Sequence, residues 1–123
     1  MHVMIDHFEI KVLNFKQCLE FYSLVLAPLK IENKWSESSA AGFGLISENK
    51  TRFLIEESEQ VSRTHIAFSS SEKSLVELFH AVGISNGYVC NGVPGLREDY
   101  SPNYYAAFLL DPDGNNIEAV IYL

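Results

Sequence analysis

Residues 65–68, His-Ile-Ala-Phe, repeat residues 7–10, His-Phe-Glu-Ile, 58 positions further along the chain. The first stretch alternates polar and apolar side chains, which is typical of a strand that buries one face. Two further correspondences follow in the same order: Leu75, Leu78, Phe79 and Val82 match Phe15, Cys18, Leu19 and Tyr22, and residues 107–110 match residues 42–45. A repeat of this kind indicates one structural unit written twice.

The repeat divides the chain into a first module, about residues 1–58, and a second module, about residues 63–123, joined by a polar linker. In the first module we expect a strand at 4–12, a helix at 15–26 capped by Asn14, and strands at 42–46 and 52–56. In the second we expect a strand around 65–68, a helix capped by Ser71, and strands around 107–110 and 117–123. Strands flanking one helix per module predict an α+β domain with both helices on one sheet face.

Composition describes an ordinary globular chain. Of its 123 residues 47% are hydrophobic and 20% charged, and no apolar run reaches the roughly 18 residues of a membrane span. The net charge of -7 and the scattered Lys and Arg residues argue against nucleic-acid and membrane partners. The N-terminal residues do not resemble a signal peptide, so we expect a single cytoplasmic domain. Its two cysteines, Cys18 and Cys90, are expected to be buried or half-buried thiols.

Three side chains on the expected strands are suited to a metal ion. His7 and His65 occupy equivalent places in the two repeats, and Glu118 lies on the last strand. Each projects to the side opposite the apolar row of its own strand. Two imidazoles and one carboxylate suit a borderline divalent ion and leave coordination positions open for substrate. A single inward His is more often a hydrogen-bonded core residue, and the residues alone leave both interpretations open.

Four motifs, in order, resemble the glyoxalase/bleomycin-resistance/extradiol dioxygenase (vicinal oxygen chelate) superfamily. They are residues 5–8 (IDHF), 19–26 (LEFYSLVL), 64–68 (THIAF) and 111–118 (DPDGNNIE), and they cover essentially the whole chain. The resemblance implies two tandem βαβββ modules that form a curved mixed sheet with helices on its outer face. It also implies that His7, His65 and Glu118 bind one divalent metal ion (Zn, Fe, Mn or Ni).

The first module departs from the glyoxalase I pattern, which has a fourth ligand, a glutamate, on its last strand. Alignment of the repeats places Leu54 at the position of Glu118, and Leu54 has no ligating atom. Glu56 has the same strand parity and is a candidate ligand or catalytic base only if the register shifts; otherwise it is a solvated glutamate. A set of two His and one Glu without a fourth ligand resembles the dioxygenase and fosfomycin-resistance branches.

The candidate substrate-binding residues are Arg97, Tyr104 and Trp35. The first two belong to residues 92–105, the longest stretch that we expect to be irregular, and loops of this length are usually functional or disordered. The tyrosines of this stretch argue against disorder. We interpret Arg97 as a candidate anion clamp, with a surface salt bridge to one of the two acidic residues that follow it as the alternative.

These features predict a metal-dependent enzyme that acts on a small molecule by lyase, transferase or dioxygenase chemistry, in which the metal chelates substrate oxygens. The alternative is a non-catalytic binding protein of the bleomycin-resistance type, and a protein-interaction scaffold has less support. Each module presents only half a cleft, so the modules must pair within one chain or across two. We therefore expect a two-fold homodimer.

Overall fold

The computed structural model describes residues 5–123, and Met4, where we expect the first strand to begin, lies outside them. The first module contains β1 (Phe8–Val12), α1 (Phe15–Val25), the short 3₁₀ helix η1 (Ala27–Leu29), β2 (Ile31–Ser36), β3 (Ala40–Leu45) and β4 (Phe53–Glu57). The second module contains β5 (His65–Ser69), α2 (Lys73–Ser85), β6 (Val89–Leu96), β7 (Tyr104–Leu110) and β8 (Asn116–Tyr122). Each module is a βαβββ unit, so the α+β prediction is confirmed.

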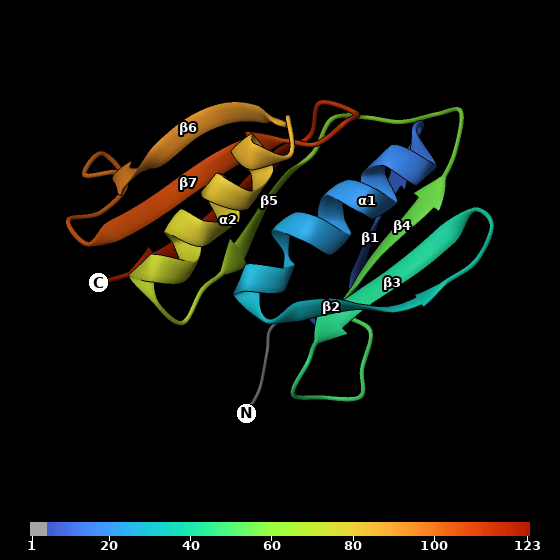
Figure 1. The fold of residues 1–123 in the computed structure, drawn as a ribbon, viewed down its shortest axis with the longest axis horizontal. Coiled ribbons are helices and arrows are strands. Elements are labelled where there is room, and N and C mark those ends of the chain that lie inside the picture. The colour runs from blue at the N-terminus through green and yellow to red at the C-terminus, as the bar shows by residue number, and fades with distance from the viewer. Residues whose placement is uncertain (1–4) are drawn as a thin grey trace.

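Each module folds into its own four-stranded mixed sheet. The strand orders are β1-β4-β3-β2 and β5-β8-β7-β6, with β1 parallel to β4 and β5 parallel to β8. The mixed sheet expected from the resemblance is therefore present as two halves. In Figure 1 the helices α1 and α2 lie side by side across one face of the two sheets, and they contact each other. In the described residues, the opposite face of each sheet carries no helix.

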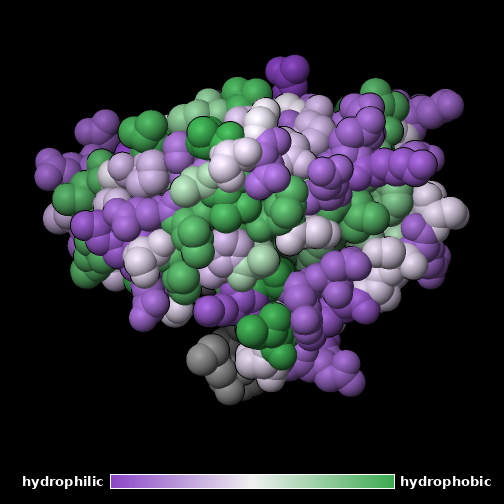
Figure 2. Space-filling model, in the orientation of Figure 1, coloured by the Kyte–Doolittle hydropathy of each residue, from purple (hydrophilic) through white to green (hydrophobic). Residues whose placement is uncertain are grey.

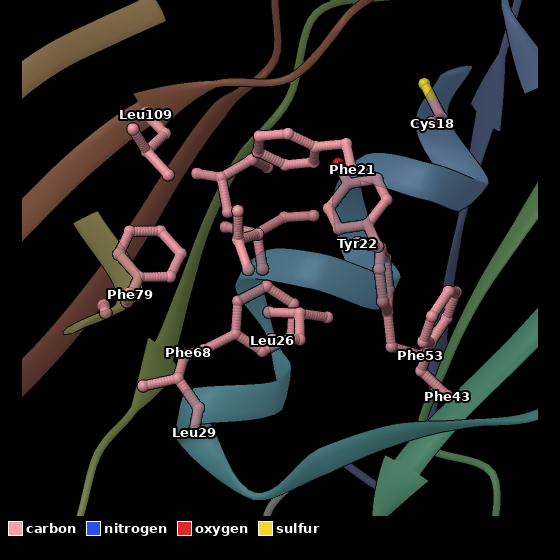
Figure 3. Close-up of a cluster of buried hydrophobic side chains, with 14 of the residues drawn as sticks. Cys18, Phe21, Tyr22, Leu26, Leu29, Phe43, Phe53, Phe68, Phe79 and Leu109 are labelled. Carbon is pink, nitrogen blue, oxygen red and sulfur yellow. The ribbon is translucent and has the colours of Figure 1, made fainter. Parts of the chain in front are cut away.

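The apolar faces of both helices and both sheets meet in one continuous core. Phe21 and Tyr22 of α1 are fully buried, and their rings stack edge to face at 4.9 Å. Phe68 of β5 contacts Phe53 of β4 across the module boundary, with ring centroids 5.4 Å apart. Figure 3 shows these side chains pointing into the same interior as Phe79 of α2. Because burial of apolar area is the main favourable term in folding, the shared core holds the two modules together.

The Asp-Pro-Asp-Gly-Asn turn between β7 and β8 connects the second module to the first by hydrogen bonds. Asp111 is only 4% exposed and accepts hydrogen bonds from the Tyr22 hydroxyl at 2.5 Å and the Asn115 side chain at 2.8 Å. Asp113 accepts hydrogen bonds from two backbone N–H groups just before α1, where a negative charge is favourable. Burial and the Asp111 charge raise the pKa of Tyr22 well above its ordinary value, so its hydroxyl remains a donor.

The strand β2 is not among the elements that we expect from the sequence, because it is a half-exposed edge strand that needs no apolar alternation. Two local predictions are wrong, each for a physical reason. Residues 92–105 are not one long loop, because β6 is also an edge strand, and an edge strand tolerates Pro94. Neither predicted helix cap forms: the side chain of Asn14 makes no capping bond, and Glu72, not Ser71, precedes α2.

One of the two cysteines is more exposed than we expect from the sequence. Both cysteines are free thiols; Cys18 is fully buried, as expected, but Cys90 is exposed on β6. Figure 2 shows hydrophobic and hydrophilic side chains interspersed over the face that carries the helices. Among residues 5–123, no helix has both the length and the apolar character needed to cross a membrane.

Candidate functional site

The face of the second sheet opposite α2 is called the site face below, and it is defined by His65, Ala67, Phe108, Asn116 and Glu118. The strand register aligns His65 with Asn116 in one row, and Ala67 with Glu118 and Phe108 in the next. Strand partners in a row project to the same side of a sheet. The site face therefore gathers polar side chains of β5 and β8 beside an aromatic side chain of β7.

Glu118 is the buried carboxylate of the site face. Its side chain is 2% exposed, whereas that of His65 is 52% exposed. One carboxylate oxygen lies 2.8 Å from Nε2 of His65, and the other accepts a hydrogen bond from the Tyr104 hydroxyl. A buried charge needs such partners, because desolvating an unpaired carboxylate is very costly. The structure thus brings together His65 and Glu118, two of the three predicted metal ligands, and adds Tyr104, a predicted substrate contact.

Tyr104 is held in its protonated form. Burial, together with the hydrogen bond to Glu118, raises the pKa of Tyr104 above its ordinary value. Its ring packs against a small apolar cluster of the site face, made of Ala106, Phe108 and Val120. At neutral pH the hydroxyl is therefore a fixed donor to the carboxylate.

Two asparagines continue this hydrogen-bond network beyond the imidazole. Asn116 donates from Nδ2 to Nδ1 of His65 at 2.9 Å, and Asn91 of β6 donates to Oδ1 of Asn116 at 3.0 Å. A neutral imidazole that accepts at Nδ1 carries its proton on Nε2. His65 consequently donates to Glu118. Each donor in this series of hydrogen bonds, from Asn91 through Asn116 to His65, is directed toward the buried carboxylate.

Arg97 lies beside the site face. Its guanidinium is 5.3 Å from the centroid of the Phe108 ring, and the His65 ring is 6.2 Å from the same centroid. A Cβ on Gly92 or Gly95 would lie only 3.2 or 3.1 Å from the guanidinium nitrogens, so the two glycines make room for this side chain. Within residues 5–123 no carboxylate forms a salt bridge with Arg97, which donates instead to the backbone carbonyl of Val93 at 2.6 Å. The alternative of a salt bridge to a neighbouring acid is therefore wrong.

His7 lies in the first module and does not join His65 and Glu118. Its Nδ1 is 2.8 Å from a carboxylate oxygen of Asp6, and its side chain is 61% exposed. Lys50 also pairs with Asp6, at 3.0 Å. The hydrogen bond from His7 and that from Lys50 lower the pKa of Asp6 to about 2. His7 is thus part of an exposed polar cluster of its own.

Within the described part of the chain, residues 5–123, no three His, Cys, Asp or Glu side chains are grouped so that they could hold a metal ion. The donor types of His65 and Glu118 suit a borderline divalent ion. However, Nε2 of His65 donates a proton to Glu118 and offers no lone pair. A metal at this nitrogen needs the proton on Nδ1 and the Asn116 amide turned to accept it. Within residues 5–123 of one chain, a metal ion at His65 and Glu118 would therefore need the other tautomer of His65 and a third donor from elsewhere.

The first module supplies no equivalent of Glu118. β1 pairs with β4 without a register shift, and Leu54 takes the place that Glu118 takes in the second module. Glu56, the candidate fourth ligand or base, instead pairs with Lys11 at 2.7 Å, and both side chains are exposed. Trp35, the third candidate substrate contact, is also in the first module, where its indole N–H hydrogen-bonds to a threonine of the same module.

One pocket borders the site face without including His65 or Glu118. A pocket of about 220 Å³ lies at the seam between the modules, and its lining includes Phe8, Phe53, Phe68, Ala67 and Ser69. It borders the site face along β5 but contains neither member of the pair. Its cation, Arg52, is already neutralised by Glu48 at 2.7 Å. We give more weight to the hydrogen-bonded carboxylate, because it combines burial and charge with donor atoms that suit a divalent ion.

Three residues of the site are not identified by the sequence analysis: Asn116, Asn91 and Phe108. Asn116 lies two residues before Glu118, so its strand parity is a signal that places it on the same face. Asn91 lies on the edge strand β6, which the pattern does not reveal, and no signal points to it. Phe108 is part of an apolar strand whose two faces look alike in sequence, because β7 is buried on both sides.

Comparison with protein-family models and with curated proteins gives no match. Among solved structures, a glyoxalase/bleomycin resistance protein from Albidiferax ferrireducens has a TM-score of 0.80 and 27% identity, over 96% of this chain and 98% of that one. A glyoxalase/bleomycin resistance protein/dioxygenase family enzyme from Burkholderia phytofirmans has a TM-score of 0.72 and 17% identity, over 96% of this chain and 98% of that one. A lactoylglutathione lyase from Agrobacterium tumefaciens has a TM-score of 0.72 and 15% identity, over 97% and 93%. The last two matches show the fold alone, and the resemblance seen in the sequence is confirmed.

Proposed function

We propose that this chain, which has the fold of the glyoxalase/bleomycin-resistance/dioxygenase superfamily, is a metal-dependent enzyme that acts on a small molecule at the site face. The observation that carries the proposal is the Glu118 carboxylate, 2% exposed and 2.8 Å from an imidazole. Burying such a pair often stabilises a fold less than apolar residues of the same volume do. Its presence is therefore better explained by chemistry than by stability.

The metal ion would be held by His65 and Glu118 of one chain and by His7 of a second copy. Two observations support this division: His65 contacts Glu118, and within residues 5–123 of one chain no three such donors are grouped around a common point. It also gives the expected homodimer a function, because each site is incomplete without the neighbouring chain. When bound, an ion of the Zn, Fe, Mn or Ni type supplies a Lewis acid for lyase, transferase or dioxygenase chemistry.

The residues of the chain itself would bind and orient an anionic substrate. The guanidinium of Arg97 has no carboxylate partner among residues 5–123, and a guanidinium recognises a carboxylate or phosphate through two parallel hydrogen bonds. Phe108 offers a flat apolar surface between Arg97 and His65. Tyr104, which stays protonated, holds the Glu118 carboxylate in one orientation. A small carboxylate or phosphate compound is the substrate class that fits.

A mixing experiment tests the shared site. His7→Ala protein and Glu118→Ala protein should each lose bound divalent metal, measured by elemental analysis. In a hybrid dimer of the two, one site keeps His7 from one chain and His65 with Glu118 from the other, so mixing should restore metal. The matched control mixes His65→Ala with Glu118→Ala: both defects lie in the second module, so no hybrid site is intact. Unchanged metal content in both single variants would overturn the proposal.

The second candidate function is metal-free binding of a small molecule, as in proteins of the bleomycin-resistance type. It is favoured by one observation: both oxygens of Glu118 and both ring nitrogens of His65 already have hydrogen-bond partners within one chain. Chelator treatment separates the two candidates. Ligand binding that survives complete removal of metal supports the second, and binding that is lost and returns with added metal supports the first.

A further inference from the structure

A second group of reactive side chains lies on the face of the second sheet that carries α2, opposite the site face. Nε2 of His80 in α2 is 3.1 Å from Sγ of Cys90 in β6, and the backbone N–H of Gly92 lies 3.3 Å from the same sulfur. We propose that Cys90 is a nucleophilic thiol, activated by His80, that exchanges with low-molecular-weight disulfides. It would thereby be a site of reversible covalent modification.

The local structure of β6 creates this arrangement. The ladder between β6 and β7 is irregular between Cys90 and Gly92, and at this irregularity the Gly92 N–H points toward the sulfur. Because β6 is the edge strand of its sheet, Cys90 stays open to solvent and to a disulfide of small size. A Cβ at position 92 would lie 2.7 Å from the Phe108 ring, so the position accepts only glycine without rearrangement.

The pair has the parts that thiol activation needs. Nε2 of His80 lies within hydrogen-bond distance of the thiol and is placed to accept its proton. The Gly92 N–H can then stabilise the thiolate with a charge-assisted hydrogen bond. A nucleophile and a base within hydrogen-bond reach form the usual signature of an activated thiol.

The exchange step balances without an added oxidant. His80 takes the proton from Cys90, and the thiolate attacks one sulfur of the disulfide, forming a new S–S bond. The original S–S bond breaks, and the leaving thiolate takes the proton back from His80. Cys18 does not resolve the mixed disulfide, because it is fully buried and burial raises the pKa of its thiol. The adduct persists until a small thiol reverses the exchange.

Thiol exchange kinetics test the proposal. An ordinary cysteine thiol is only about 3% thiolate at pH 7, so activation can raise its rate by at most about thirtyfold, and we expect about tenfold. Wild-type protein should react with 5,5′-dithiobis(2-nitrobenzoate) about ten times faster than His80→Gln protein. Cys90→Ser should remove the fast phase, and Cys18→Ser should leave it unchanged. Oxidised glutathione should add one glutathione, located on Cys90 by peptide mass spectrometry.

Two controls keep the result specific. Leu78→Gln alters an exposed side chain of the same helix, 47% exposed, and should leave the rate unchanged. In concentrated urea, wild type and His80→Gln should react equally fast, because the pairing exists only in the folded protein. Equal rates for folded wild type and folded His80→Gln, or a wild-type rate no faster than that in urea, would overturn the proposal.

Discussion

The two modules have the same fold but place different chemistry on the face opposite their helix. In the second module, one row carries Ala67, Glu118 and Phe108, and its carboxylate is buried. The equivalent row of the first module carries Glu9 and Leu54, and the carboxylate there is exposed. The same backbone thus supports a buried, hydrogen-bonded carboxylate in one copy and a solvated one in the other.

The energies of these two arrangements differ, which explains why one face is the candidate site. Lys11 of the first module pairs with Glu9 and Glu56, but all three side chains are about 40% exposed. Such pairs contribute little to stability, because water screens them. Glu118 depends on His65 and Tyr104, and losing one donor to a buried charge costs about 1–3 kcal/mol or more. These interdependent polar groups make the face of the second module the candidate site.

The largest expected loss of stability comes from removing Asp111, the buried carboxylate of the turn that connects the two modules by hydrogen bonds. Asp111→Ala leaves the buried Tyr22 hydroxyl, the Asn115 side chain and two backbone N–H groups without their acceptor. We expect the free energy of unfolding to fall by about 3 kcal/mol or more, measured by urea denaturation. Asp99→Ala, on an exposed turn, is the control and should stay within about 0.5 kcal/mol. A loss below about 1 kcal/mol for Asp111→Ala would show that the modules hold together by the core alone.

Tyr104→Phe tests how much the buried Glu118 carboxylate of the second module depends on its hydrogen-bond donors. The substitution removes one of the two donors to the buried Glu118 carboxylate and keeps the ring that packs beside it. We expect a loss of about 1–3 kcal/mol in the free energy of unfolding at neutral pH. A variant as stable as the wild type would mean that water satisfies this carboxylate.

Alkaline pH should reveal the same hydrogen bond. The pKa of Tyr104 is raised in the folded protein, chiefly by burial, whereas the unfolded chain releases the proton near pH 10. Above that pH the unfolded state binds fewer protons than the folded state, so stability falls as pH rises. The urea midpoint of wild type should therefore fall more steeply above about pH 10 than that of Tyr104→Phe. Parallel curves would contradict the raised pKa.

The smallest effect is expected in the first module. Lys11→Met removes the cation between Glu9 and Glu56 on a solvated face. The urea midpoint should stay close to that of the wild type, and raising the salt concentration should shrink the difference further. A loss as large as that of Tyr104→Phe would remove the contrast between the two faces.

The sequence predicts the repeated architecture well, because the strands and helices that meet the core carry strict apolar periods, as β1 and β5 do. It misses β2 and β6, since edge strands with one solvated face need no such period. The alternation of side chains along each strand predicts that His65 and Glu118 lie on one face, and in the structure the two side chains are in contact. Parity does not place His7, because its relation to Glu118 depends on how the modules pair. The role of Asn91 depends on a tertiary contact that no local pattern encodes.

The central claim, that the buried Glu118 carboxylate of the second module is a metal ligand, is tested most directly by titrating Ni²⁺ into metal-free protein by calorimetry. Wild type should bind about one ion per chain. Glu118→Gln should abolish this binding, and Glu56→Gln, the matched change on the equivalent face, should leave it as in wild type. Unchanged binding in Glu118→Gln, or loss of binding in Glu56→Gln, would contradict the account.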